Sequence, residues 1–333
     1  MTRLPKAAAF AAAVALLVAA CGDDKDGDDA ATTSAPAAES TAPAEAATTT
    51  AAGGSSADAT YPVTVDAANG AVTLDAAPTR IVSLSPTATE MLFAIGAGDQ
   101  VAAVDELSNY PAEAAAKTTT LSGFTPSAEA ISGYTPDLVV VAGVTEGIDT
   151  QLAALDIPLW SGPDATTFDD VYTQIEQLGA LTGHIGDAAA LVAQMQGDIE
   201  AATADLPDRE VPLTYYHELD NTYYSVSSNT FIGEVYGLFG LRNIADATEG
   251  DTDYPQLSAE FIVSQNPDLI FLADADFGES AATVAARPGW AELSAVTNGG
   301  VVPLNADIAS RWGPRVVDLV ETVGQAVAAV PAG

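Results

Sequence analysis

The sequence predicts an α/β protein with two similar lobes, each built on a mostly parallel central sheet, joined by a long rigid helix. Short apolar runs alternate with segments of helical spacing, a pattern typical of parallel sheets covered by helices. One segment also occurs twice, as SAEAISGYTPDLVVVA at 127–142 and SAEFIVSQNPDLIFLA at 258–273. Each copy reads as a short helix, a Pro-Asp-Leu stop and a strand, so the repeat predicts one such step in each lobe.

The elements before the first copy are predicted to be a hairpin and a strand–helix–strand unit. Residues 62–75 alternate apolar and polar positions around Asn69-Gly70, a dipeptide that favours tight hairpin turns. The following helix is expected to begin at Ser85 or Thr87 and to end at a glycine pair. Strands of this half are expected in the apolar runs 80–84, 100–104, 138–142 and 157–160.

The middle of the chain, residues 166–206, is predicted to be a helical connector between the lobes. Its apolar residues recur at helical spacing with no strand between them, and Asp187 suits the start of the longer helix. The strand–helix alternation resumes after this connector and ends in a helix near the C-terminus. We therefore expect an N-terminal lobe at 61–165 and a C-terminal lobe at 207–333.

The first 60 residues are predicted to lie outside the folded part. Arg3 and Lys6 precede a short apolar run that ends at Cys21, the one cysteine of the chain, and this pattern resembles a bacterial lipobox. Residues 1–21 would then be a lipoprotein signal peptide and Cys21 the lipidated residue; the alternative is a plain secretory signal that contains a cysteine. Residues 22–60 are rich in Asp, Ala, Thr, Ser and Pro, which predicts a disordered acidic tether. The folded part is thus expected outside the cytoplasm, anchored by lipid to the outer face of the cell membrane.

The charge and the motifs exclude several classes of protein. The chain has 46 acidic and 10 basic residues, and a net charge of −36 argues against nucleic acid as a partner and against membrane contact except through the lipid anchor. The sequence has no HExxH, GxSxG or phosphate-binding loop, so we expect no enzyme activity and no metal site. A hydrolase that uses His217 beside Glu218 and an adhesive surface lipoprotein remain as alternatives.

The order of several motifs resembles a known family of binding proteins. The motifs are TRIVSLSPTATEMLFAIGAGDQVAAV at 79–104, SNYP at 108–111, the two repeated segments, and ASRWGPRVVDLVE at 309–321. Over about residues 79–330 they resemble the periplasmic proteins that bind cobalamin and ferric siderophores for ABC importers. The resemblance implies a monomeric, bilobed solute-binding lipoprotein whose partner is the permease dimer of an importer. The implied ligand is cobalamin or another corrinoid, with a ferric siderophore or haem as the alternative; the protein needs no cofactor, although its ligand would contain cobalt or iron.

Both copies of the repeat keep a glutamate, Glu129 and Glu260, in the first turn of the expected helix. A carboxylate there interacts favourably with unpaired amides and the helix dipole, and this explains the residue without any functional role. The family resemblance adds a second interpretation, in which one glutamate on each lobe docks on arginines of the permease. An exposed carboxylate at a rigid helix start suits both roles.

A ligand is expected in the cleft at the carboxyl ends of the strands. Aromatic side chains are prominent in the loops that follow the strands, and they suit a large flat ligand such as a corrin or porphyrin. The resemblance matches five of these loop residues to cleft positions of cobalamin binders: Tyr110, Phe124, Tyr224, Tyr254 and Asp307. Tyr223, Arg311 and Trp312 complete the set of candidate ligand-binding residues. Arg311 is expected to pair with a carboxylate or phosphate of the ligand.

Overall fold

The computed structural model describes residues 59–143, 147–204, 206–207, 209–248, 250 and 252–331. The predicted signal peptide, its Cys21 and nearly all of the predicted tether therefore lie outside the described residues. Within the described residues no helix combines the length and the apolar character needed to cross a bilayer.

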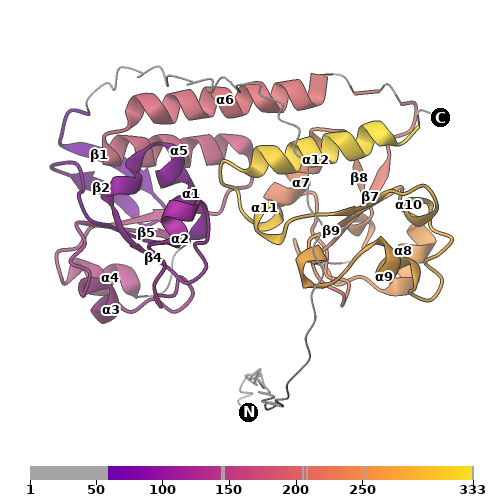
Figure 1. Cartoon of the computed structure of the whole chain (residues 1–333), viewed down its shortest axis with the longest axis horizontal. Helices are drawn as coiled ribbons and strands as arrows, with labels where there is room; N and C mark the ends of the chain where they lie inside the picture. Colours follow the sequence, from indigo (N-terminus) through magenta and orange to yellow (C-terminus); the bar gives the residue numbers. More distant parts are fainter. Residues whose placement is uncertain are drawn as a thin grey trace, which may run out of the picture. The chain divides into compact units, whose positions relative to one another are not determined.

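The N-terminal lobe is built on a parallel four-stranded sheet with the order β4-β3-β5-β6, covered by helices (Figure 1). Its strands are β3 (Ile81–Leu84), β4 (Val101–Val104), β5 (Leu138–Ala142) and β6 (Leu159–Gly162). The predicted hairpin is confirmed as an antiparallel pair, β1 (Val63–Ala67) and β2 (Gly70–Leu74). It is held to β6 because the Asn69 side chain donates to the Leu159 carbonyl at 2.9 Å.

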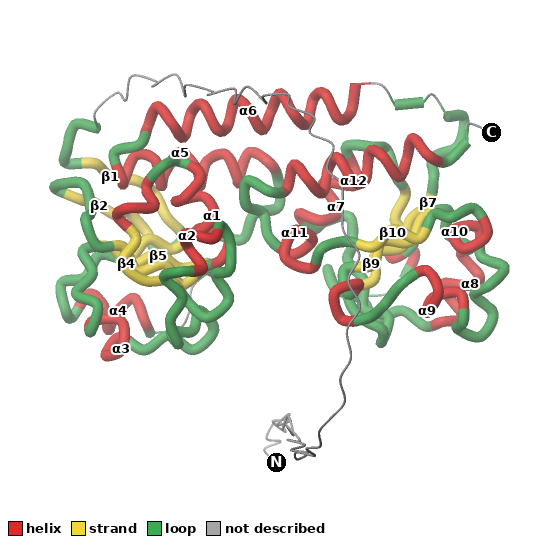
Figure 2. Tube along the Cα trace, in the orientation of Figure 1, coloured by secondary structure: helices red, strands yellow, loops and turns green. Residues whose placement is uncertain are grey.

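The C-terminal lobe contains a second parallel four-stranded sheet with the order β10-β9-β7-β8 (Figure 2). Its strands are β7 (Thr214–Glu218), β8 (Arg242–Asn243), β9 (Leu269–Leu272) and β10 (Val301–Pro303). The strands of the two repeats, β5 and β9, occupy equivalent places, each paired in parallel with the first strand of its sheet along the chain. The prediction of two similar α/β lobes is confirmed.

The two repeated segments form equivalent helix–strand steps. Their helices are α3 (Ala128–Ser132) and α8 (Ala259–Gln265). Ser127 and Ser258 cap these helices by accepting a hydrogen bond from a backbone N–H of the first turn. The aspartates of the two Pro-Asp-Leu stops also share a role, because Asp137 accepts from the Arg80 N–H and Asp268 from the Thr214 N–H. Each aspartate thus fixes the start of the neighbouring strand, a function that the sequence pattern did not reveal.

Two helices make the strand-free middle of the chain. They are α5 (Phe168–Thr182) and α6 (Ile185–Ala204). Gly183 separates them with a φ of 84°, a left-handed conformation that ends α5. The longer helix begins at Ile185, two residues before the expected Asp187. Helix α6 packs along α5 at one end and along α12 (Val316–Ala329) at the other, so it runs past both lobes (Figure 1).

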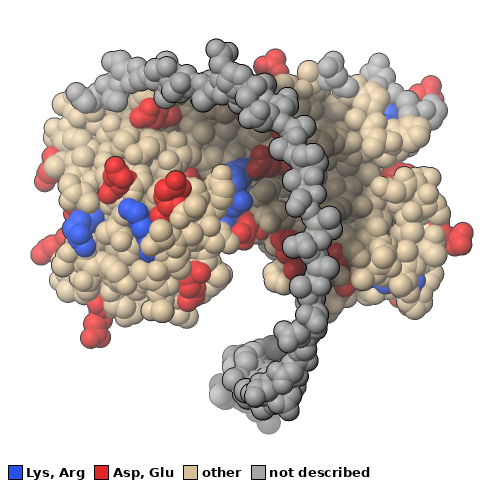
Figure 3. All heavy atoms as spheres, viewed as in Figure 1, with Lys and Arg blue, Asp and Glu red and all other residues tan. Residues whose placement is uncertain are grey.

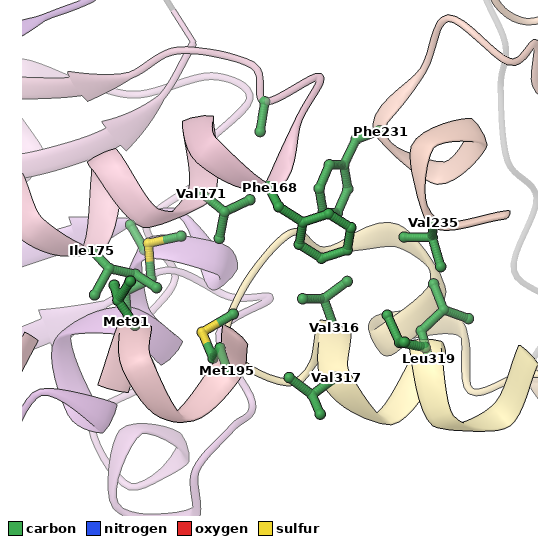
Figure 4. Close-up of a cluster of buried hydrophobic side chains, with 14 of the residues drawn as sticks. Met91, Phe168, Val171, Ile175, Met195, Phe231, Val235, Val316, Val317 and Leu319 are labelled. Carbon is green, nitrogen blue, oxygen red and sulfur yellow. The ribbon is translucent and has the colours of Figure 1, made fainter. Parts of the chain in front are cut away.

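A continuous apolar core joins the lobes beneath these helices (Figure 4). Phe168 at the start of α5 and Phe231 at the start of α7 (Phe231–Gly237) meet edge to face, with ring centroids 5.2 Å apart. Met91, Met195 and Val316 belong to the same buried cluster. The rigidity that the sequence assigned to one helix is therefore shared with side-chain packing between the lobes.

The remaining elements connect the strands within each lobe. In the N-terminal lobe they are α1 (Pro86–Ala94), η1 (Ala97–Gln100), α2 (Ala112–Ala115) and α4 (Ile148–Ala153). In the C-terminal lobe they are η2 (Ala245–Ala247), η3 (Ala275–Phe277), α9 (Ala281–Ala285), α10 (Ser294–Thr297) and α11 (Ala306–Ser310). Helix α1 begins at Ser85 rather than Thr87, because the Ser85 hydroxyl accepts from the Ala88 N–H.

Candidate functional site

Two adjoining cavities lie at the carboxyl ends of the sheet strands, where the sequence placed the ligand. One has a volume of about 570 Å³ and reaches Leu84 at the end of β3, Ala142 at the end of β5 and Asp105 just after β4. The other, of about 410 Å³, lies between residues that follow β6 and the start of α7. Both are lined by Ser310, Arg311 and Trp312. We call these two cavities together the cleft; each has the size typical of small-molecule sites. The surface is hollowed between the lobes in Figure 3.

Phe124 and Tyr254 each line one cavity, from opposite lobes. Phe124 is 79% exposed and lies in the 570 Å³ cavity, whereas Tyr254 is 55% exposed and lies in the other. The loop before Phe124 presses against β3, since a Cβ on Gly123 would meet the Leu84 carbonyl oxygen at 2.4 Å. The two rings do not share one cavity, and Arg311 and Trp312 form the part of the lining that the cavities have in common.

Arg311 is engaged by the protein itself. Its guanidinium donates to Glu90 Oε1 at 3.0 Å, to Asn109 Oδ1 at 2.9 Å and to Asp307 Oδ1 at 2.6 Å. Arg315 donates to both oxygens of Glu90, at 2.8 and 2.6 Å. Glu90 is on α1 of the N-terminal lobe and is 3% exposed, while both arginines follow the last strand of the C-terminal lobe. One buried carboxylate therefore holds two guanidinium groups across the lobes, and we call this arrangement the Glu90 network.

Sequence reasoning missed Glu90 and did not include Arg315 among the candidate site residues. Two features of the sequence could have indicated the network. One is a carboxylate within the mostly apolar run of α1, and the other is a pair of arginines four residues apart in a chain with few basic residues. Arg315 occupies the N-cap position of α12, and its side chain makes no capping hydrogen bond there. The hydrogen bonds and charge of Glu90 raise the pKa of Arg315.

Tyr110, Asp307 and Trp312 are placed around this network. The Tyr110 ring lies 4.1 Å from the Arg315 guanidinium and lines a separate cavity of about 480 Å³ beside α6 and α12, not the cleft. Asp307 accepts from Asn109 across the lobes at 2.8 Å and lines the cleft. Trp312 lines the cleft and donates its ring N–H to Gln174 at 3.3 Å.

Tyr223 and Tyr224 line neither cavity of the cleft. Tyr223 has a φ of 71°, and its ring stacks on Trp290 with centroids 5.7 Å apart. Tyr224 is 40% exposed and forms an isolated bridge with Gln256. Beside Trp290, Arg287 binds both oxygens of the buried Glu218 at 2.6 Å, an ion pair that sequence reasoning did not find.

His217 is enclosed in the C-terminal lobe. Its Nδ1 lies 2.8 Å from the Tyr236 hydroxyl, and burial lowers its pKa to about 3, so the imidazole is neutral near pH 7. A side chain without solvent access cannot reach an external substrate, and the neighbouring Glu218 is held by Arg287. The geometry therefore does not favour the hydrolase alternative. Within the described ranges no group of three or more His, Cys, Asp or Glu residues is arranged to hold a metal ion.

Glu129 and Glu260 are exposed in the first turns of α3 and α8, one on each lobe. Neither glutamate lines either cavity of the cleft. The capping geometry of both helices leaves these carboxylates projecting from rigid positions.

The comparisons with known proteins agree with this architecture. The profile of the periplasmic binding protein family matches residues 81–308. A cobalamin-binding protein of Halobacterium salinarum is 34% identical over 269 residues, which cover 78% of this chain and 72% of that protein. An ABC transporter substrate-binding lipoprotein of Bacillus subtilis, itself uncharacterized, is 30% identical over 80% of this chain and 86% of its own length. The crystal structure of the vitamin B12-binding protein of Vibrio cholerae superposes with a TM-score of 0.63 at 29% identity, covering 75% of this chain and 96% of that one.

The chain belongs to the periplasmic binding protein family. Members of this family are solute-binding proteins and not enzymes.

Glu90→Gln should destabilise the protein, because two half-buried guanidinium groups would lose the charge of the buried carboxylate that they share. We expect the free energy of unfolding to fall by about 3 kcal/mol, as when one partner of a buried ion pair is removed. Chemical denaturation of the purified protein measures the change. The matched control, Glu176→Gln on the exposed face of α5, should change it by less than about 0.5 kcal/mol. Equal losses in the two variants would show that the Glu90 network contributes nothing specific.

Proposed function

We propose that this protein is an extracytoplasmic solute-binding lipoprotein that captures cobalamin or a related corrinoid between its lobes and delivers it to an ABC import permease. The observation that carries the proposal is the cleft at the carboxyl ends of the strands, with aromatic side chains from both lobes. Phe124, Tyr254 and Trp312 offer ring faces to a flat macrocycle, and Ser310, Thr166 and Asn229 offer polar groups to amide side chains. The relatives named for cobalamin and vitamin B12 support the choice of ligand.

Binding on this proposal needs little movement of one lobe against the other. The Glu90 network and the apolar core around Phe168 and Phe231 both connect the two lobes. A preformed cleft loses less conformational entropy on binding than one that must close. On this proposal the ligand enters an open cleft, and the protein delivers it by docking with the cleft facing the permease.

Titration of the purified protein by calorimetry should show saturable binding of cyanocobalamin. Phe124→Ala should weaken this binding roughly tenfold, as the loss of an aromatic contact worth about 1.4 kcal/mol would do. Leu155→Ala removes an exposed apolar side chain of the same lobe that does not line the cleft, and it should bind like the unchanged protein. Saturation by haem or ferric siderophores alone would show that one of these, and not cobalamin, is the ligand. Saturation by none of the three would contradict the ligand assignment altogether.

We propose further that Glu129 and Glu260 dock on cationic side chains of the permease. Two exposed carboxylates, one per lobe, would fix the orientation of the protein and report that the lobes are correctly spaced. The double variant Glu129→Ala, Glu260→Ala should therefore bind ligand normally but support no uptake by cells. The control is Glu113→Ala with Glu292→Ala, which removes one acidic residue from each lobe elsewhere. Normal uptake by the docking variant would contradict the proposal.

The lipid anchor is the remaining part of the proposal and rests on the sequence around Cys21. A named lipoprotein among the relatives supports it. Cells that express the protein should incorporate radioactive palmitate into it, and Cys21→Ala should abolish that labelling. Labelling of the Cys21→Ala protein at the original level would show that another residue carries the lipid or that the label is not covalently attached at the lipobox.

A further inference from the structure

Basic side chains are scarce around the cleft. Three of the chain's 10 lysines and arginines lie in the first 58 positions, and seven follow. Within the described part of the chain, Arg311 is the one member of these seven that lines either cavity of the cleft. The positions after residue 58 that the structure leaves undescribed contain no lysine or arginine in the sequence, so they add no positive charge.

The positive charge of Arg311 is balanced by carboxylates of the protein itself. Its two terminal nitrogens are occupied by Glu90, Asp307, Asn109 and the Leu107 carbonyl. A carboxylate or phosphate of a ligand that took the place of Glu90 or Asp307 on these nitrogens would displace the protein's own counter-charge. The displaced carboxylate of Glu90, which is 3% exposed, would then be buried with a weakened counter-charge. The cleft therefore lacks a cation that could neutralise an anionic ligand.

Carboxylates, by contrast, line the cleft without such partners. Asp164 and Asp253 line the cavity that contains Tyr254, and Asp105 lines the cavity that contains Phe124. None of these three takes part in an ion pair of the described residues. Asp164 follows β6 of one sheet and Asp253 belongs to the other lobe, so negative charge reaches the cleft from both sides.

The Tyr254 phenol responds to this negative field. Burial, with smaller contributions from the charges of Asp164 and Asp253, raises the pKa of Tyr254. The same field acts on any anionic group of a ligand placed against this ring. It also disfavours the tyrosinate form, which is the form in which tyrosine ligates haem iron.

We propose that the cleft selects its ligand by charge, accepting a neutral or cationic macrocycle or chelate and rejecting one that carries free carboxylates. This inference rests on the proposed function, because it concerns the ligand of that same site. It follows from the paired state of Arg311 and the position of Asp164, Asp253 and Asp105. Like charges in a partly desolvated cleft repel more strongly than in water, and such repulsion is an effective means of excluding related ligands. Haem, with its two free propionates, is excluded on this basis. Cyanocobalamin is accepted, because its acetamide and propionamide side chains are uncharged and the charge of its one phosphodiester is balanced by the cobalt centre of the same molecule.

A matched pair of ligands tests the inference. Cyanocobalamin is compared with its monocarboxylic acid, in which one side-chain amide is hydrolysed and nothing else changes. At low ionic strength the acid should bind the purified protein roughly tenfold more weakly than the amide, the effect of one charge about 8 Å from two solvent-exposed carboxylates at an effective dielectric constant of about 60. At 1 M salt the ratio should fall towards one, because the screening length shortens to about 3 Å.

Variants identify the carboxylates responsible. Asp164→Asn combined with Asp253→Asn should reduce the ratio between the two ligands, and should do so at low salt more than at high salt. The control Glu292→Gln removes an exposed carboxylate of the C-terminal lobe that does not line the cleft, and it should leave the ratio unchanged.

Each outcome bears on one of the two proposals. Equal affinity for the amide and the acid, or a ratio that neither salt nor the asparagine variants alter, overturns selection by charge and leaves the proposed function intact. Tight binding of haem without cyanocobalamin overturns selection by charge and the choice of ligand, but not the solute-binding class. Binding of no corrinoid, haem or ferric siderophore overturns the proposed ligand and the inference with it.

Discussion

The arrangement of the cleft depends on a single buried carboxylate, Glu90. Its two oxygens receive hydrogen bonds from Arg311 and Arg315, which lie more than 220 positions away in the sequence. Burying these charges costs solvation free energy, and an apolar replacement of equal volume could be as stable. The benefit of the network is therefore geometric. It fixes the segment from Asp307 to Arg315 against the N-terminal lobe, and that segment forms the lining shared by the two cavities.

Apolar packing and hydrogen bonding both hold the two lobes together, in different ways. The core around Phe168 and Phe231 is non-directional and contributes contact area, whereas the Glu90 network is directional and sets the register. Helix α6 spans the lobes but does not act alone, because α5 and α12 pack along it. Rigidity in this molecule is thus a property of three helices, a shared core and one ionic network.

The fold could be predicted from the sequence more completely than the site. Strand periodicity is a local pattern, so it identified the strands of both sheets except the two-residue β8, and the repeat identified the equivalence of β5 and β9. Phe124, Tyr254 and Trp312 were found because cleft residues follow strands in this class of fold. Glu90 was missed because its meaning arises only from distant partners. Tyr223 was predicted to lie in the cleft because it follows β7. In the structure its backbone is left-handed, and its ring stacks on Trp290 rather than lining the cleft.

The placing of the three tryptophans has a practical consequence for spectroscopy. Trp160 and Trp290 are fully buried, one in each lobe, whereas Trp312 is partly exposed and belongs to both cavities. A coloured ligand will quench all three by energy transfer, but a change in emission wavelength requires a change in the polarity around the indole ring. Such a wavelength shift would come from Trp312. The molecule therefore contains its own optical indicator of an occupied cleft, which needs no attached dye.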